Sequence, residues 1–294
     1  MISLNNNATK IAFYTLGCRL NQSETAVIET TFAQEGYRIV PFEEPADIVV
    51  INTCTVTENG DSDTRRLVNK VGRINPWAKI ALVGCQAQIQ KEQLLNLPNV
   101  QWVVGNQRKM DLTEIVRDFK QQNQPQVITP TISREPFVMP VAGLQEHRTR
   151  ANIKIQDGCD FFCSFCEIPY ARGRARSRVF SDILLEAQAL VAAGYRELVV
   201  TGINVGTYFY QSYQFMDVIK ALEAIPQLQR IRISSIEPTT IPVELFRRMN
   251  KQSKLCRHLH IPLQSGSNRV LTEMKRKYLR EEFAAFIQTV HGMV

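Results

Sequence analysis

Three cysteines stand close together in the stretch DGCDFFCSFCEIPYARGRARSR, residues 157–178. The C-x3-C-x2-C spacing of Cys159, Cys163 and Cys166 directly follows the short alternating run 153–155, so we expect these thiols on a loop that leaves a β-strand. Three thiolates at this spacing can hold one iron–sulfur cube and leave its fourth iron open for chemistry. The alternatives are a zinc site or unrelated buried thiols, but a zinc site usually offers four ligands, and no further Cys or His lies close by in the sequence.

A second set of cysteines follows three predicted strands of the N-terminal half. The apolar runs that predict these strands are residues 10–16, 47–51 and 79–83, and the cysteines beyond them are Cys18, Cys54 and Cys85. Ligands of an open α/β sheet bind beyond the carboxyl ends of its strands, and neighbouring strands lie about 4.8 Å apart. The three thiols can therefore converge, and we predict a second three-cysteine cluster. The alternative is three ordinary buried cysteines.

The elements that must position these cysteines alternate between strand and helix in both halves of the chain. We predict an α/β fold with an N-terminal domain built on an open parallel sheet over residues 1–122. A polar, proline-containing linker follows at 123–150, and a second βα domain occupies 151–294. Its strand signals lie at 153–155, 197–203, 231–236 and 258–263. Four βα units are too few for the usual eight-stranded barrel, so we expect an incomplete one.

Positive charge is concentrated beside the cysteine loop. The chain carries a formal net charge of +7, which favours a polyanionic partner without establishing one. Four alternating arginines follow the loop directly: Arg172, Arg174, Arg176 and Arg178. Arginines so placed can contact phosphates and a base edge of a nucleic acid. The alternative is a solvated loop with local ion pairs.

Several other classes of protein do not fit the composition. The apolar runs, such as 48–51, are far shorter than the roughly 18 residues typical of a membrane span, so we expect no membrane association. The N-terminus lacks the basic and apolar regions of a secretory signal. Seven cysteines are an odd number, and their placement is not typical of a disulfide framework. A reducing cytoplasm is the expected location.

The two cysteine sets and their surroundings resemble the methylthiotransferase family of radical S-adenosylmethionine (SAM) enzymes. The resemblance rests on TLGCRLNQ, NTCTVT and GCQAQ in the first domain and on CDFFCSFCEIPYARGRARSR and HLHIPLQSGS in the second, and it runs through essentially the whole chain. TLGCRLNQ, INTCTVT and MKRKY further resemble the branch that acts on N6-threonylcarbamoyladenosine at position 37 of tRNA. The isopentenyladenosine-tRNA and ribosomal-protein branches usually differ at these places.

The resemblance implies an auxiliary-cluster domain, a radical SAM partial barrel and a C-terminal RNA-binding TRAM domain. This sequence supplies only four βα units of the barrel and no TRAM region, so we expect a C-terminally truncated chain.

The resemblance also implies roles for individual residues. Cys159, Cys163 and Cys166 would hold the 4Fe-4S cluster that cleaves SAM, and Cys18, Cys54 and Cys85 would hold an auxiliary 4Fe-4S cluster. Further contacts to SAM would come from Phe165, Thr201, Gly202, Glu237 and Gln264. No catalytic residue is assigned beyond the cluster ligands.

The implied reaction adds a methylthio group to C2 of the adenine of N6-threonylcarbamoyladenosine at position 37. The partners would be the anticodon loop of tRNA and an electron donor such as a flavodoxin or ferredoxin. Two alternatives remain open. The chain could be a methylthiotransferase acting on isopentenyladenosine-tRNA or on a ribosomal protein, or a non-catalytic iron–sulfur protein that binds RNA or senses redox state.

Overall fold

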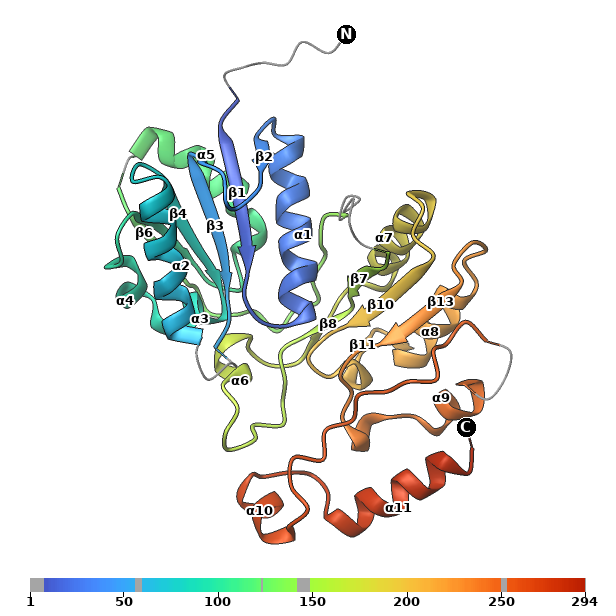
Figure 1. Cartoon of the computed structure of the whole chain (residues 1–294). Coiled ribbons are helices and arrows are strands. Elements are labelled where there is room, and N and C mark those ends of the chain that lie inside the picture. The colour runs from blue at the N-terminus through green and yellow to red at the C-terminus, as the bar shows by residue number, and fades with distance from the viewer. Residues whose placement is uncertain (1–7, 56–59, 123, 142–148, 250–252, 294) are drawn as a thin grey trace. The chain divides into compact units, whose positions relative to one another are not determined.

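The computed structural model describes residues 8–55, 60–122, 124–141, 149–249 and 253–293. The chain divides into two compact units (Figure 1). The first unit comprises Met1–Ser133 together with the short segment Tyr170–Arg172, and the second comprises Arg134–Pro169 and Gly173–Val294. None of the described helices is long and apolar enough to cross a membrane.

The first unit is built on a six-stranded sheet in which every pairing is parallel. In spatial order the strands are β2 (Arg38–Val40), β1 (Lys10–Thr15), β3 (Ile48–Thr53), β4 (Lys79–Gly84), β5 (Val100–Val104) and β6 (Gln126–Ile128). All six residues of β3 are buried, as expected for a central parallel strand covered on both faces. The edge strand β6 lies within the predicted linker, whose residues 123 and 142–148 lie outside the described part of the chain.

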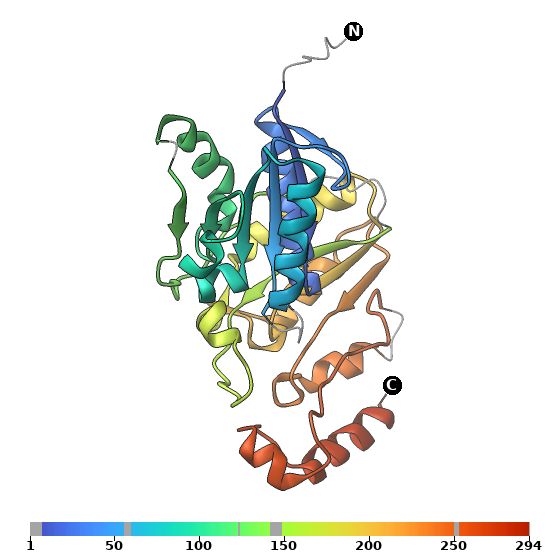
Figure 2. The ribbon, with the colours of Figure 1, turned by 60° about the vertical axis from the view of Figure 1, so that its left-hand side comes forward.

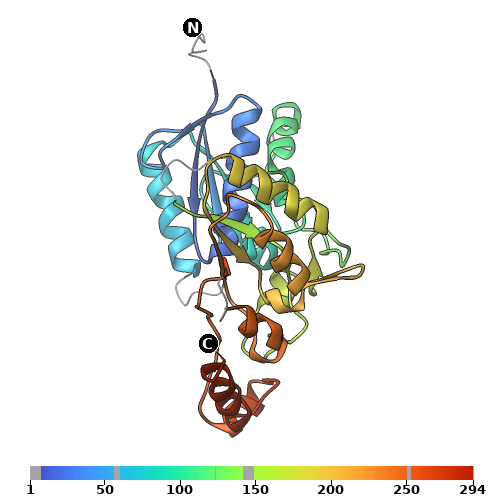
Figure 3. The same cartoon turned by 90° about the vertical axis from the view of Figure 1, so that its right-hand side faces the viewer.

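Helices cover both faces of this sheet (Figure 3). On one face, α1 (Arg19–Gln34) and α5 (Leu112–Gln122) pack apolar side chains such as Phe32 against the strands. On the other face, α2 (Gly60–Ile74), α3 (Cys85–Gln90) and α4 (Glu92–Leu95) do the same. Because successive strand residues alternate between faces, the sheet supplies apolar partners to both helix layers.

The second unit contains a three-stranded parallel sheet in the order β13 (Arg230–Ile233), β10 (Glu197–Thr201) and β7 (Ala151–Lys154). Its core includes α7 (Phe180–Ala192) and α8 (Phe215–Glu223). The chain also forms η2 (Val205–Thr207), η3 (Pro238–Thr240) and α9 (Val243–Met249). The last helices, α10 (Asn268–Glu273) and α11 (Arg280–His291), lie beyond α9 at the end of this unit (Figure 2).

The strand predicted at 258–263 is wrong as an element. The chain from Leu255 to His260 runs beside β13 but makes only isolated parallel bridges, which pair Ile231 with Leu255 and Ser235 with His260. A physical reason is that the partners lie 24 positions apart in the first bridge and 25 in the second, so the pairing shifts by one residue between them and no continuous ladder forms. The other three predicted strands of this half are present as β7, β10 and β13.

Candidate metal and cofactor sites

The cysteines of the first unit all stand beyond the carboxyl ends of adjacent strands. Cys18 precedes α1 and follows β1, Cys54 directly follows β3, and Cys85 is the first residue of α3 after β4. These strands are neighbours in the sheet, and the register that pairs Thr53 with Gly84 brings the ends of β3 and β4 level. Cys18 is exposed, whereas Cys54 and Cys85 are buried.

Two glycines make the turns that place these cysteines. Gly17 has φ +91°, and a Cβ added to it would lie 2.5 Å from the Sγ atom of Cys54. Gly84 has φ +100°, and its added Cβ would lie 2.5 Å from the Oδ1 atom of Asn52. Both positions therefore require glycine for its conformation and for the space it leaves. Because Gly17 has no Cβ atom, the side chain of Cys54 can approach the backbone directly before Cys18.

The loop of Cys159, Cys163 and Cys166 leaves the second unit's sheet through a short β-ribbon. Within that ribbon, β8 (Gln156–Asp157) pairs antiparallel with β9 (Arg176–Ser177). The amide of Cys159 donates to the Gly173 carbonyl at 3.1 Å, and the amide of Cys166 donates to the Cys163 carbonyl at 3.0 Å. These two bonds fix the backbone conformation at the first and last cysteines of the loop.

The thiols of this loop influence one another electrostatically. Burial raises the pKa of the Cys159 thiol to about 11, and its neighbours Cys166 and Cys163 act in the same direction, while the amide of Phe161 opposes them. Burial also raises the pKa of Cys166. A raised pKa means that the thiols hold their protons at neutral pH, so metal binding must release those protons.

The donor chemistry of both sets suits iron–sulfur clusters, because soft thiolates are the ligands that such clusters use. In the described ranges, however, no three His, Cys, Asp or Glu side chains are close enough to share a single metal ion. The structure therefore places one cysteine set at one edge of a sheet and the other set on one loop. In neither set are the three side chains close enough together to bind a single metal ion.

Arg276 is a residue of the thiol loop's surroundings that sequence reasoning missed. Its Nη1 atom donates to the Sγ atom of Cys163 at 3.3 Å, and its Nη2 atom forms an ion pair with Glu237. Tyr278 accepts a hydrogen bond from the same guanidinium at 3.0 Å and donates to the Pro262 carbonyl at 2.7 Å. Arg276 lies in MKRKY, one of the stretches that resemble a particular branch of the family.

The other residues predicted to contact SAM lie at different depths of the second unit. Thr201 ends β10, is buried, and donates its hydroxyl to the Ile153 carbonyl at 3.1 Å. Glu237 follows β13, and burial raises its carboxyl pKa although Arg276 opposes the shift. Phe165 is half exposed, and Gln264 is exposed with φ +69°.

A glutamine connects one of these strand ends to the thiol loop. The Oε1 atom of Gln156 accepts from the amides of Ile203 and Asn204 at 2.9 and 3.0 Å, and its Nε2 atom donates to the Gly158 carbonyl at 2.8 Å. A Cβ added to Gly202 would lie 2.9 Å from this Oε1 atom, so the backbone at Gly202 packs directly on Gln156.

Two buried polar atoms at the same sheet edge have no partner in the described part of the chain. They are the Nδ2 atom of Asn204 and the Oγ atom of Ser234, and both residues follow the ends of sheet strands. Buried polar groups are normally hydrogen-bonded, so these atoms fit a site that a polar ligand completes. SAM, with its amino, carboxylate and hydroxyl groups, is a ligand of this kind. Asn204 lies in the stretch TGINVGTY at residues 201–208, of which only Thr201 and Gly202 were predicted to contact SAM.

The four arginines after the loop occupy different environments. Arg172 and Arg178 are fully buried, and Arg178 forms an ion pair with Glu186. Arg176 contacts Asp157 at 3.5 Å with a largely buried side chain. Arg174 alone of the four is well exposed, and its guanidinium lies 4.3 Å from the centre of the Phe162 ring. Arg174 also forms an exposed ion pair with Asp160 at 3.1 Å, and it is the member of this set whose side chain is most accessible to a large partner.

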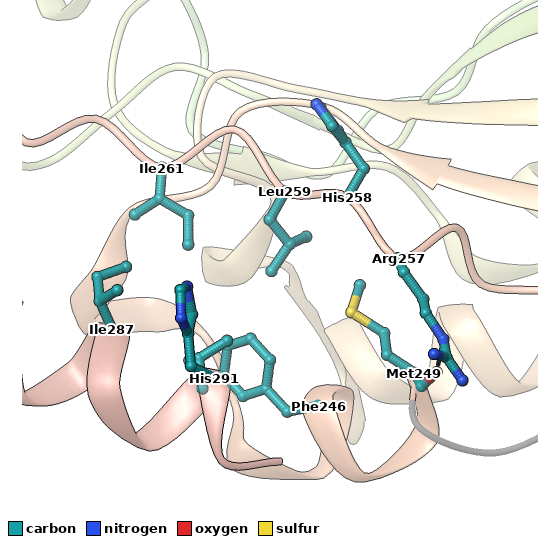
Figure 4. Close-up of a pocket in the computed structure, with 9 residues that line it drawn as sticks. Phe246, Met249, Arg257, His258, Leu259, Ile261, Ile287 and His291 are labelled. Carbon is teal, nitrogen blue, oxygen red and sulfur yellow. Dashed lines mark hydrogen bonds between the residues drawn. The ribbon is translucent and has the colours of Figure 1, made fainter. Parts of the chain in front are cut away.

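A pocket of about 430 Å³ lies elsewhere in the second unit, between α9, the segment at 257–261 and α11 (Figure 4). The side chains of Phe246, Leu259 and Ile261 converge on it. None of the predicted site residues lines this pocket.

Two family models match the chain. Residues 10–105 match the uncharacterized protein family UPF0004, and residues 153–293 match the radical SAM superfamily. The first match contains Cys18, Cys54 and Cys85, and the second contains Cys159, Cys163 and Cys166.

The chain is also similar to several curated proteins. It is 40% identical to a threonylcarbamoyladenosine tRNA methylthiotransferase, MtaB, of Bacillus subtilis, over 93% of this chain and 62% of that protein. It is 38% identical to MtaB of Aquifex aeolicus, over 96% of this chain and 69% of that protein. It is 31% identical to a tRNA-2-methylthio-N6-dimethylallyladenosine synthase of Flavobacterium johnsoniae, over 98% of this chain and 64% of that protein. The chain thus spans less than two thirds of some of these relatives.

Among solved structures, the fold is similar to that of a radical SAM methyltransferase, TsrM, of Kitasatospora setae. The TM-score is 0.67 at 12% identity, and the match covers 97% of this chain and 66% of that one. At this identity the likeness shows the fold alone. It agrees with the predicted class, an open parallel-sheet domain followed by a radical SAM domain.

Proposed function

Because this chain belongs to the radical SAM methylthiotransferase family, we propose that it carries out methylthiolation at C2 of N6-threonylcarbamoyladenosine at position 37 of tRNA. The observation that carries the proposal is the pairing of two separate three-cysteine sets, one beyond adjacent strands of the first unit and one on the loop of the second. The relatives named for this tRNA nucleoside support the choice of substrate, at 34–40% identity.

The residues take distinct roles in this proposal. Cys159, Cys163 and Cys166 would hold the SAM-binding 4Fe-4S cluster, while Cys18, Cys54 and Cys85 would hold the auxiliary one. When bound, SAM and the two clusters supply the radical, methyl and sulfur chemistry. The chain's own residues position these groups and exclude water.

The strand ends of the second unit would bind SAM. Phe165, Thr201, Gly202, Glu237 and Gln264 are the predicted contacts. To these we add Asn204 and Ser234, because the buried Nδ2 atom of Asn204 and Oγ atom of Ser234 have no hydrogen-bond partner among the described residues. Arg276 would hold Cys163 and Glu237 in a fixed relation through its two contacts.

The proposed partners are tRNA and a flavodoxin or ferredoxin that delivers electrons. Arg174 is the arginine of the loop best placed to contact RNA, because its side chain is the most exposed of the four. Arg172, Arg176 and Arg178 would act on the substrate only indirectly, since their guanidinium groups are buried in ion pairs.

Iron analysis tests the cofactor part of the proposal. After anaerobic reconstitution with iron and sulfide, we expect about eight irons per chain, falling to about four in Cys159→Ala/Cys163→Ala/Cys166→Ala. About four irons in both proteins would remove the SAM-binding cluster. Stoichiometric zinc without iron would favour a non-catalytic metal protein.

Nucleoside mass spectrometry tests the substrate. The reconstituted protein, SAM, sulfide and a reductant are incubated with tRNA that carries threonylcarbamoyladenosine and, separately, with tRNA that carries dimethylallyladenosine. We expect a methylthio product only from the first tRNA. Product only from the second would favour the other tRNA branch, to which the chain is 29–31% identical. No product from either, with both clusters present, would contradict the proposed activity.

A further inference from the structure

The side chain of Arg172 lies in the interior of the first unit, although the sequence places it just after the thiol loop. The structure assigns the segment Tyr170–Arg172 to the first unit. The side chains of Arg172 and Glu24 are 1% and 0% exposed, so their ion pair is shielded from water. The guanidinium binds the carboxylate with both of its terminal nitrogens, at 2.9 and 3.0 Å. This fork geometry is specific to arginine.

The same guanidinium reaches the backbone that carries two of the cysteines. Its Nη2 atom donates to the Oδ1 atom of Asn21 at 2.5 Å. The Nδ2 atom of Asn21 in turn donates to the carbonyl of Leu16 at 2.9 Å and to the carbonyl of Thr53 at 3.1 Å. Leu16 lies two residues before Cys18, and Thr53 lies directly before Cys54. Arg172 therefore orients the amide that ties these two turns together.

A second branch reaches the third cysteine. Lys109, which is 1% exposed, donates to Glu24 at 2.5 Å and to the Oδ1 atom of Asn106 at 2.6 Å. The Nδ2 atom of Asn106 donates to the Ala171 carbonyl at 2.6 Å and contacts the Sγ atom of Cys85 at 3.6 Å. The side chain of Arg172 and the carbonyl of Ala171 are thus connected through hydrogen bonds to the turns that carry all three cysteines.

We propose that Arg172 is a positioning residue for the site of Cys18, Cys54 and Cys85, acting through a buried network with Asn21, Glu24, Asn106 and Lys109. We call these five residues (Arg172, Asn21, Glu24, Asn106 and Lys109) the Glu24 network. The inference rests on the proposed auxiliary cluster at the three cysteines. Outer groups that orient ligands commonly change metal affinity 10- to 100-fold, about the range expected here.

The test uses the full chain with Cys159→Ala/Cys163→Ala/Cys166→Ala as the parent protein, so that only the first unit's cysteine set can hold a cluster. The parent should hold about four irons. Adding Arg172→Gln should speed the loss of iron to a chelator about tenfold or more and alter the electron paramagnetic resonance spectrum of the reduced cluster. Arg172→Lys should give an intermediate rate, because an ammonium keeps the charge but not the fork.

Arg178→Gln is the matched control. Arg178 is as deeply buried as Arg172 and pairs with Glu186, but it belongs to the second unit and has no contact with the Glu24 network among the described residues. We expect its chelation rate to equal that of the parent. A parent-like rate in Arg172→Gln would overturn the inference. A parent protein that binds no iron would instead contradict the auxiliary site itself.

Thiol alkylation of the iron-free proteins separates positioning from unfolding. Arg172→Gln should raise the reaction rate of Cys54 and Cys85, which are each 2% exposed in the structure, and leave that of Cys256 in the second unit unchanged. If Cys256 also reacts faster, Asn106→Ala decides, because it removes the contacts to Cys85, Ala171 and Lys109 and leaves the ion pair of Arg172 with Glu24 in place. A parent-like chelation rate in Asn106→Ala would then overturn the inference.

Discussion

Cys163 receives a hydrogen bond from a guanidinium that also neutralises a carboxylate. Arg276 occupies this position, and its own side chain is 3% exposed. A cation and a hydrogen bond beside a thiolate ligand stabilise the reduced state of the cluster, because that state carries more negative charge. The residue therefore bears on the redox properties of the proposed SAM-binding cluster as well as on the shape of the loop.

Replacing Arg276 by Gln should make the reduction potential of that cluster more negative, because a positive charge near Cys163 is lost. The potential is measured by spectroscopic titration in a Cys18→Ala/Cys54→Ala/Cys85→Ala background, which leaves one cluster. The control is Arg269→Gln, which removes an exposed ion pair with Glu273 in α10. An unchanged potential in Arg276→Gln would show that the contact with Cys163 does not act on the cluster.

A second charged residue, Glu197 in β10, supplies a pH-dependent contribution to stability. Burial alone would raise its pKa, but hydrogen bonds from Arg230 and Arg232 outweigh this effect and lower it below the usual 4.5. A lowered carboxyl pKa stabilises the folded state above the unfolded pKa, and the contribution is lost as the pH falls through the folded one. Glu197→Gln should therefore destabilise the protein by about 1–2 kcal/mol at pH 7 and by progressively less below about pH 4.5.

Denaturant unfolding of the second unit at a series of pH values measures this difference. Glu244→Gln is the matched control, because Glu244 forms a half-exposed pair with Lys220 and its loss should cost under about 0.5 kcal/mol. If the loss of unfolding free energy in Glu197→Gln stays constant from pH 7 to well below 4.5, the lowered pKa assigned to the Glu197 carboxyl is contradicted.

At the scale of elements, the turn between β4 and α3 depends on a backbone conformation that only glycine adopts easily. Gly84→Ala should cost about 1–3 kcal/mol from strain alone, and the added methyl group would also meet Asn52 and the backbone of Thr53. We expect lower thermal stability and poor iron retention in the first unit's site. Gly72→Ala in α2 is the control, since its methyl group meets nothing and a helix favours alanine over glycine. Equal stability of the two variants would contradict this account.

The elements that the sequence predicted well are those with continuous apolar runs. Strands β1, β3 and β4 lie close to their predicted ranges, because a buried parallel strand needs an unbroken run of apolar residues. The short edge strands β2 and β6 have too few residues to produce such a pattern, and both were missed. At 258–263 the apolar pattern was present, but a one-residue change of register beside β13 leaves only isolated bridges.

The sequence predicted those site residues whose chemistry follows from their spacing in the sequence or from their position after a strand. The six cysteines stand out by their spacing or by their position after strands. The contacts of Arg172 and Arg276 could not be predicted in this way, because their partners Glu24 and Cys163 lie 148 and 113 residues away in the sequence. Contacts at such separations depend on tertiary structure. The alternating arginines also looked alike in sequence, whereas folding buries two of them fully and leaves one well exposed.

At the scale of the whole molecule, the net charge of +7 bears on binding of the proposed tRNA partner. Each phosphate that a cationic side chain neutralises releases counterions, so the affinity for tRNA should fall linearly on a log–log plot against salt concentration. Arg174→Gln should weaken binding at low salt and reduce the magnitude of the slope by about 1, because one phosphate contact is lost.

Fluorescence anisotropy with labelled tRNA at several salt concentrations measures the slope. Arg178→Lys serves as the control, since Arg178 is fully buried and a lysine keeps the charge, so its slope should equal that of the unmodified chain. Equal slopes for Arg174→Gln and the unmodified chain would exclude Arg174 as a phosphate contact. An affinity that does not change with salt would exclude electrostatic recognition of the RNA backbone, and the positive charge of the chain would then require a different explanation.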